Sequence, residues 1–259
     1  MAVRKAIRGL SPQELTRFRD AITRQKALSD ERGYNYFAGL HGLPLPIECE
    51  HGTSLFLPWH RAYIYFWELA LQDLVPGVGI PYWDWTSDVA HQRGLPEAYT
   101  EERVNGVENP LFSTTVEWSR ELIDQVLQNP RLRGTLTQEG RTLRDPDPPD
   151  ELPRKATIDR ILALRSFEDF SISLEQVHGD VHVWGGGAMS QVPTAGYEPW
   201  FTAHHSMIDR LWYLWQLDHP GGDPPATIMQ TVLTPFPMRV ADTLDIERLG
   251  YGYAVQNAQ

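Results

Sequence analysis

The placement of histidines within helix-forming segments is the feature that most restricts how this chain folds. His178 and His182 are separated by four positions, so on an α-helix they differ by about 40° in direction and share one face. Two imidazoles presented from one helix face form a chelating pair for a metal ion. Core packing or chance explains many such pairs, so this pair needs support from the other histidines.

A second group of histidines leads into another helix-forming segment. His51 and His60 are nine positions apart, which on one straight helix makes them point about 180° apart. Both reach one metal ion only if the chain turns between them, and Pro58 favours such a turn because proline starts a helix readily but disrupts its interior. We therefore expect His51 in the approach to a helix and His60 on its first turn. His41, on a Gly-Leu-Pro-Leu-Pro stretch, is expected to complete a trio from a loop.

Apolar periodicity and capping residues predict four principal helices. Ser11, Pro12 and Glu14 form a capping box that opens a helix to about residue 28. The other three are expected at residues 58–74, 167–182 and 199–219. Residues 129–155 are rich in Pro, Asp and Arg and are expected to form an exposed loop. The predicted fold is mainly α, with a four-helix-bundle core, long connecting loops and little strand, in a single domain spanning residues 1–259.

Two groups of three imidazoles indicate a dinuclear metal site. The second group consists of His178, His182 and one member of the pair His204 and His205, between which periodicity does not choose. Without interleaved carboxylates, such groups suit copper better than magnesium, calcium or manganese, which prefer oxygen ligands. Zinc remains chemically open, because three histidines and a water also form a catalytic zinc site.

Charge and cysteine content narrow the partners and the compartment. The net charge of −11 argues against nucleic acid or an anionic membrane surface as the main partner. The N-terminus lacks the apolar run of a signal peptide, and no stretch reaches the roughly 20 apolar residues of a membrane span. With one cysteine, Cys49, no internal disulfide forms. We expect a cytoplasmic protein, or one exported together with a signal-bearing helper protein.

Four sequence blocks resemble the type 3 copper proteins, the superfamily of tyrosinases, catechol oxidases and haemocyanins. The blocks are HGTSLFLPWHRAY at residues 51–63, YWDW at 82–85, HGDVHVWGG at 178–186 with EPWFTAHHSMIDRLW at 198–212, and DIERLGYGY at 245–253. The resemblance runs from about residue 10 to residue 253. It implies a short, bacterial-like form that ends without a C-terminal domain covering the site, and therefore without built-in latency.

The resemblance also implies the ligands of two copper ions. One copper is held by His41, His51 and His60, and the other by His178, His182 and His205. His204 is then a buried supporting residue. Copper delivery by a helper protein is a further expectation.

Residues next to these ligands are expected to support them. Metal-bound histidines usually donate their second ring nitrogen to an acceptor, and we expect Asp209 to orient the second site, with Arg210 or Arg61 balancing its charge. Some members of the superfamily carry a thioether bond between a cysteine placed like Cys49 and the histidine carbon at the position of His51. We expect that crosslink here.

The resemblance implies an enzyme that uses O2 to oxidise o-diphenols, and o-aminophenols, to quinones. Hydroxylation of monophenols needs a nearby base. In relatives active on monophenols, an asparagine directly after the first histidine of the second site is held by an upstream glutamate with a shared water. This chain has Gly179 at the asparagine position and Val183 after His182, and Glu175 is the candidate for that glutamate. The pocket entrance is expected at the small residues Val192, Pro193, Thr194 and Ala195. The alternatives are a haemocyanin-like reversible oxygen carrier and a zinc hydrolase.

Overall fold

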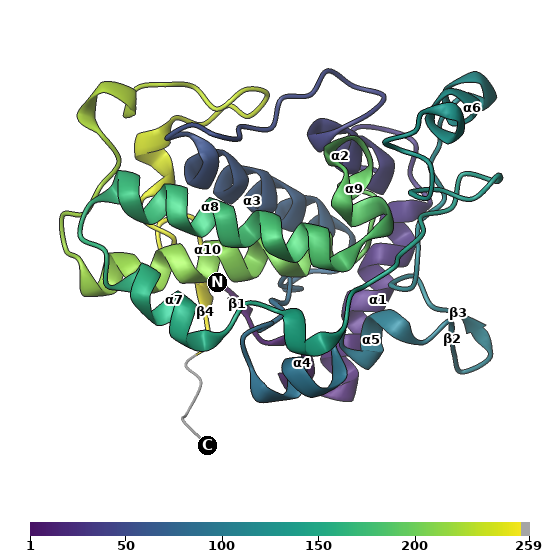
Figure 1. Ribbon diagram of the computed structural model, residues 1–259, viewed down its shortest axis with the longest axis horizontal. Helices are drawn as coiled ribbons and strands as arrows, with labels where there is room; N and C mark the ends of the chain where they lie inside the picture. The colour runs from purple at the N-terminus through teal and green to yellow at the C-terminus, as the bar shows by residue number, and fades with distance from the viewer. Residues whose placement is uncertain (255–259) are drawn as a thin grey trace.

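The structure is a computed structural model that describes residues 1–254 and is mainly helical (Figure 1). Its four longest helices are α1 (Pro12–Lys26), α3 (Phe56–Leu74), α8 (Phe167–Gly185) and α10 (Phe201–Asp218). The shorter α-helices are α2 (Tyr34–His41), α4 (Asp88–Arg93), α5 (Glu97–Thr100), α6 (Arg120–Gln128), α7 (Lys155–Leu162) and α9 (Val192–Ala195). The 3-10 helices are η1 (Ile7–Gly9), η2 (Pro149–Glu151), η3 (Gly187–Ser190), η4 (Ala226–Ile228) and η5 (Val240–Thr243). No described helix is long and apolar enough to cross a membrane.

Helix α3 lies at the centre of the bundle. It packs against α1, α8 and α10 (Figure 1). The surfaces between these helices are filled by aromatic side chains that are almost fully buried, including Trp59, Trp67, Trp212 and Trp215. Large aromatic side chains bury much apolar area each, so they supply a major part of the driving force for packing. The predicted helical fold and its bundle core are confirmed.

The predicted helices are confirmed with small shifts at their ends. The capping box at the start of α1 is present, because Ser11 accepts from the amide of Glu14 and the Glu14 carboxylate accepts from the amide of Ser11. Helix α3 begins two residues before the expected Pro58. Proline is tolerated there because the first-turn amides of a helix have no partner within the helix.

The expected loop position of His41 is wrong, since His41 is the last residue of helix α2. Sequence patterns do not predict this short helix, for two reasons. It is buried over most of its length, so it has no polar face, and it begins after Gly33 without a side-chain cap. Both the periodicity and the capping signals of a helix start are therefore missing.

The expectation of an exposed loop at residues 129–155 is wrong in part. The segment is mostly irregular, but Thr135, Leu136 and Thr142 are buried. Arg144 reaches inward from it, donating from Nε to the Glu198 carboxylate at 3.0 Å and hydrogen-bonding backbone carbonyls of neighbouring segments. Buried carbonyls need donors, and a long guanidinium supplies several at once.

A parallel strand pair joins the two ends of the described chain. Strand β1 (Ala2–Arg4) pairs with β4 (Tyr251–Tyr253), and Ala2 lies opposite Tyr251 (Figure 1). A second, antiparallel pair is formed by β2 (Arg103–Val104) and β3 (Val107–Glu108). The β1–β4 pair carries Arg4 into the core, where its Nε lies 2.9 Å from the Glu68 carboxylate on α3.

Asp209 on α10 is the centre of a buried charge cluster. One of its oxygens accepts from the Arg61 guanidinium, and the other accepts from Arg4 Nη1 at 2.9 Å. The hydroxyls of Tyr251 and Tyr253 donate to the second oxygen at 2.8 and 2.5 Å. Burial alone would raise the pKa of Asp209, but the charges of Arg61 and Arg4 hold it below its ordinary value. The cluster therefore ties β1, α3, α10 and β4 together through one ionised carboxylate.

We expect Asp209→Asn to lower the free energy of unfolding by about 3–5 kcal/mol, because it leaves two buried guanidiniums undercompensated. Urea denaturation measures this. Since the folded pKa of Asp209 is depressed, its contribution is present above the unfolded pKa and is lost as pH falls through the folded pKa. The variant should therefore show a weaker loss of stability in acid than the wild type.

The matched control is Asp159→Asn, which removes an exposed carboxylate paired with Lys155. Exposed pairs contribute about 0–1 kcal/mol, so this change should be close to neutral. Equal stability of the two variants would contradict the assigned role of the cluster.

Candidate metal centre

Three histidines from three elements form the first cluster. His41 ends α2, His51 lies in the connection between α2 and α3, and His60 lies near the start of α3. Their candidate ligand nitrogens lie within 4.8 Å of one another. The turn that the sequence required between His51 and His60 is present, because His51 lies outside the helix.

Backbone carbonyls fix the orientation of two of these rings. The Nδ1 atom of His41 lies 3.3 Å from the Val192 carbonyl oxygen, and that of His60 lies 2.8 Å from the Phe56 carbonyl oxygen. In each ring Nε2 is buried and has no hydrogen-bond partner in the described chain. A ring that donates from Nδ1 presents the Nε2 lone pair, which is the form that binds a metal ion.

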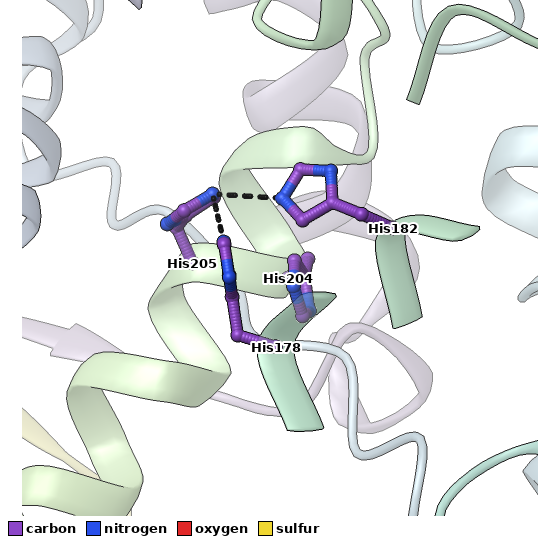
Figure 2. A group of neighbouring side chains, drawn as sticks. All are labelled: His178, His182, His204 and His205. Carbon is purple, nitrogen blue, oxygen red and sulfur yellow. Dashed lines mark hydrogen bonds between the residues drawn. The ribbon is translucent and has the colours of Figure 1, made fainter. Parts of the chain in front are cut away.

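The second cluster consists of His178 and His182 on α8 and His204 and His205 on α10 (Figure 2). The Nε2 atom of His205 lies 3.4 Å from Nε2 of His178 and 3.3 Å from Nε2 of His182. His182 is oriented by its Nδ1 atom, 2.8 Å from the Met189 carbonyl oxygen. Three Nε2 atoms therefore converge, and the third comes from His205.

His204 belongs to the same group, with a ring nitrogen within 4.8 Å of the ligand nitrogens of the other three, but its ring makes no hydrogen bond in the described chain. Its ring stacks on His178, with centroids 5.1 Å apart and an interplanar angle of 13° (Figure 2). It is fully buried and close to Trp85 and Trp200. This placement suits a supporting residue, and the choice of His205 over His204 as the ligand stays a prediction.

The two clusters face each other across a short distance. The rings of His60 and His205 are stacked, with centroids 4.6 Å apart, and those of His51 and His178 are 5.7 Å apart. Burial lowers the pKa of all six of these histidines, that of His182 to about 4. The imidazoles are therefore neutral at neutral pH. Six neutral imidazoles in an apolar bundle form a donor set that suits copper.

A cavity of about 260 Å³ leads to the clusters. It is lined by His41, His51, His178, His182, Glu175, Gly179, Val183, Met189, Ser190, Val192 and Ala195. Val183 is 65% exposed and Val192 is 40% exposed, so these two side chains form an apolar part of the rim of the opening. This cavity is small enough to be filled by a single aromatic ring with its substituents.

Two of the four expected entrance residues do not line this cavity. Val192 and Ala195 line it, whereas Thr194 is fully buried and donates its hydroxyl to the Ala188 carbonyl at 2.9 Å. Pro193 packs closely against Gly42, and its carbonyl accepts from Leu43. These four residues form the single-turn helix α9, which directs its side chains to different sides.

The three residues proposed to act near the substrate all line the cavity. Glu175 Oε1 accepts from the amide of Gly52 at 2.6 Å. Gly179 leaves open space, because a Cβ atom built there meets nothing within 4 Å. Val183 contributes to the exposed apolar rim.

The expected partnership of Asp209 with an imidazole is not what the structure contains. In the described chain Asp209 bonds Arg4, Arg61, Tyr251 and Tyr253, and no histidine. Arg210 lies apart from this cluster, with its guanidinium 4.8 Å from the centre of the Tyr82 ring. The rings of His41, His60 and His182 are oriented by main-chain carbonyls, which are common to every residue and therefore cannot be recognised in a sequence.

Cys49 carries a free thiol next to the first cluster. Its Sγ atom donates to the His41 carbonyl at 3.4 Å. Burial raises the pKa of this thiol to about 12, so it is protonated at neutral pH. The crosslink between Cys49 and His51 stays a prediction.

Comparison with known proteins agrees with this geometry. The sequence model described as the common central domain of tyrosinase matches residues 31–218. Units G and H of haemocyanin from the cuttlefish Sepia officinalis are 33% identical over 227 residues, which cover 83% of this chain and 37% of that protein. The tyrosinase of Streptomyces lincolnensis is 29% identical over 245 residues, which cover 85% of this chain and 84% of that enzyme.

Among solved structures, a functional unit of octopus haemocyanin superposes with a TM-score of 0.83 at 28% identity. The match covers 100% of this chain and 69% of that one. The chain therefore belongs to the tyrosinase family of type 3 copper proteins, whose fold holds a dinuclear copper site. It spans only a little over a third of the cuttlefish haemocyanin that it matches.

We expect His205→Asn to bind one copper ion where the wild type binds two, because His205 supplies the converging Nε2 atom of the second cluster. His204→Asn is the matched control, since it alters the adjacent buried ring and should retain two copper ions. Copper per folded protein, measured by elemental analysis after dialysis, distinguishes them. The reverse pattern would assign the ligand to His204.

Proposed function

We propose that this protein is a dinuclear copper oxidase that uses O2 to oxidise o-diphenols to quinones and o-aminophenols to quinone imines. The observation that carries the proposal is the open, apolar-rimmed cavity, which reaches imidazoles of both clusters. An aromatic substrate in this cavity would lie directly over the metal pair. Phenolic substrates and O2 are therefore the proposed small-molecule partners.

In this proposal each histidine cluster holds one copper ion. His41, His51 and His60 hold the first, and His178, His182 and His205 hold the second. When bound, the copper pair supplies dioxygen binding and electron transfer. Overall, two o-diphenols give four electrons and four protons to one O2, which yields two quinones and two waters.

The protein's own side chains determine how the substrate lies. The exposed rim formed by Val183 and Val192 contacts the ring and displaces water from it. The absent side chain of Gly179 leaves room for ring substituents. Because burial keeps the imidazoles neutral, they stay in the form that holds a metal ion while protons leave the substrate.

Monophenol hydroxylation has less support from the cavity residues than o-diphenol oxidation has. It requires a group that accepts the phenol proton. Gly179 offers no side chain, and one oxygen of Glu175 is already occupied by the Gly52 amide. We therefore propose that o-diphenol oxidation exceeds monophenol hydroxylation in this protein.

We expect copper-loaded protein to consume O2 with a catechol and to react much more slowly with the matching monophenol. Gly179→Asn should raise the monophenol rate about 10-fold or more, because its amide fits in open space and can hydrogen-bond a water that accepts the phenol proton, and general-base assistance is worth about 10²–10⁴-fold. The oxygen electrode measures both rates, with His182→Ala as the inactive control. Equal rates with the catechol and the monophenol in the wild type would contradict the proposal that o-diphenol oxidation exceeds monophenol hydroxylation.

A reversible oxygen carrier is the second candidate, and the similarity to cuttlefish and octopus haemocyanins favours it. A carrier binds O2 without consuming it. If copper-loaded protein takes up O2 and releases it under argon, with no quinone formed from added catechol, the carrier function replaces the oxidase. The exposed rim of the cavity supports the oxidase, because it leaves the copper site accessible to a phenol.

We expect Val192→Phe to raise KM for bulky substituted catechols by about 10-fold or more while affecting catechol itself little, since a larger side chain narrows the rim. Ile172→Phe is the matched control, because Ile172 is exposed on α8 and does not line the cavity. Steady-state kinetics with a series of 4-substituted catechols measures the effect. Unchanged KM values across the series would place the entrance elsewhere.

A further inference from the structure

We propose that Glu175 is a positioning residue that fixes the loop bearing His51, and not the base that accepts a phenol proton. The inference rests on the proposed ligand assignment. It concerns how the chain keeps one of its six imidazoles in place before any metal ion binds.

His51 is the least firmly held of the six proposed ligands. The other five lie within helices α2, α3, α8 and α10. Three of them are also oriented by a carbonyl at Nδ1. His51 lies in a loop, is only partly buried, and its ring makes no hydrogen bond in the described chain. Its position therefore depends on how its backbone is held.

Two hydrogen bonds connect residues 44–52 to other elements of the described chain. The Cys49 thiol donates to the carbonyl of His41 at 3.4 Å, which is a weak sulfur contact within the same cluster. The Gly52 amide donates to Glu175 Oε1 at 2.6 Å. A hydrogen bond to a carboxylate is stronger than one between neutral groups. Since Gly52 directly follows His51, this bond is the firmer of these two anchors of the segment that carries His51.

The backbone at Gly52 suits this contact. Its φ is +68°, in the left-handed region where glycine carries little penalty. The Thr53 hydroxyl meanwhile bonds Glu50 and the Leu55 amide, which tightens the loop from within. The Gly52 amide is left to point outward, toward α8.

Glu175 lies on the face of α8 that carries the second cluster. It precedes His178 by three positions and His182 by seven, so all three project from one face of the helix. The Glu175–Gly52 bond therefore joins the loop of the first cluster to the helix of the second. It holds the loop beside α8, consistent with the stacking of His51 on His178 at 5.7 Å.

The test measures Cu(I) binding by competition with a chromophoric chelator, in two backgrounds that each keep one cluster intact. His205→Ala leaves the first cluster whole, and His60→Ala leaves the second whole. The apo-protein is prepared without copper, and its intact mass confirms that no hydrogen atoms have been lost to a Cys49–His51 crosslink. Glu175→Ala removes the acceptor, Glu175→Gln keeps an acceptor without the charge, and Asp180→Ala removes a nearby exposed carboxylate as a control.

We expect Glu175→Ala to weaken Cu(I) binding about 10–100-fold at the first cluster, which is the range found when groups that orient metal ligands are removed. The second cluster should be unaffected. Glu175→Gln should restore most of the affinity, because its side-chain oxygen still accepts from Gly52. Asp180→Ala should change neither cluster.

Three results would overturn the proposal. Wild-type affinity in Glu175→Ala would show that the bond does not hold His51. Equal losses in the alanine and glutamine variants would assign the effect to charge. Equal losses at both clusters would indicate a general structural role. Failure of the parent protein to bind two Cu(I) ions would instead refute the proposed copper pair, which separates the two proposals.

Discussion

The arrangement of this protein depends on holding six neutral imidazoles inside an apolar helical bundle with their metal-binding nitrogens facing one another. Burial removes water from these rings and keeps them uncharged. It also leaves the Nε2 atoms of His41 and His60 without a partner in the described chain. An unpaired buried polar group costs about 1–3 kcal/mol. A metal ion bound by these nitrogens offsets that cost, so copper binding and the stability of the folded state are coupled.

The bundle meets this requirement by anchoring its helices from outside the metal centre. The Asp209 cluster joins the strand pair at the chain ends to α3 and α10. Those two helices carry His60 and His205, whose rings stack across the centre of the site. The charged cluster and the imidazoles are thus separate sets of contacts on the same helices: one fixes the helices, and the other binds the metal ions.

Much of the site follows from sequence because helical spacing is a geometric rule. The His178–His182 pair and the turn between His51 and His60 are consequences of 3.6 residues per turn, and the structure contains both. Spacing does not choose between His204 and His205, and the structure places both beside His178 and His182. The capping box at Ser11 could also be predicted, because it depends only on residues close together in the sequence.

The structural features that could not be predicted from the sequence depend on contacts between distant segments. The short buried helix α2 lacks both a polar face and a side-chain cap, so His41 was expected in a loop. The carbonyls that orient His41 and His182 belong to Val192 and Met189, and a carbonyl is the same in every residue. The ion partners of Asp209 include Arg4, which is 205 positions away. The Glu175–Gly52 bond spans 123 positions and is equally invisible to local patterns.

The central claim is that two histidine triads each hold one copper ion. Anomalous diffraction at the copper absorption edge, from crystals of the copper-loaded protein, tests it most directly. The account predicts two maxima, one among His41, His51 and His60 and the other among His178, His182 and His205. A single maximum, or a second one coordinated by His204 in place of His205, would contradict it.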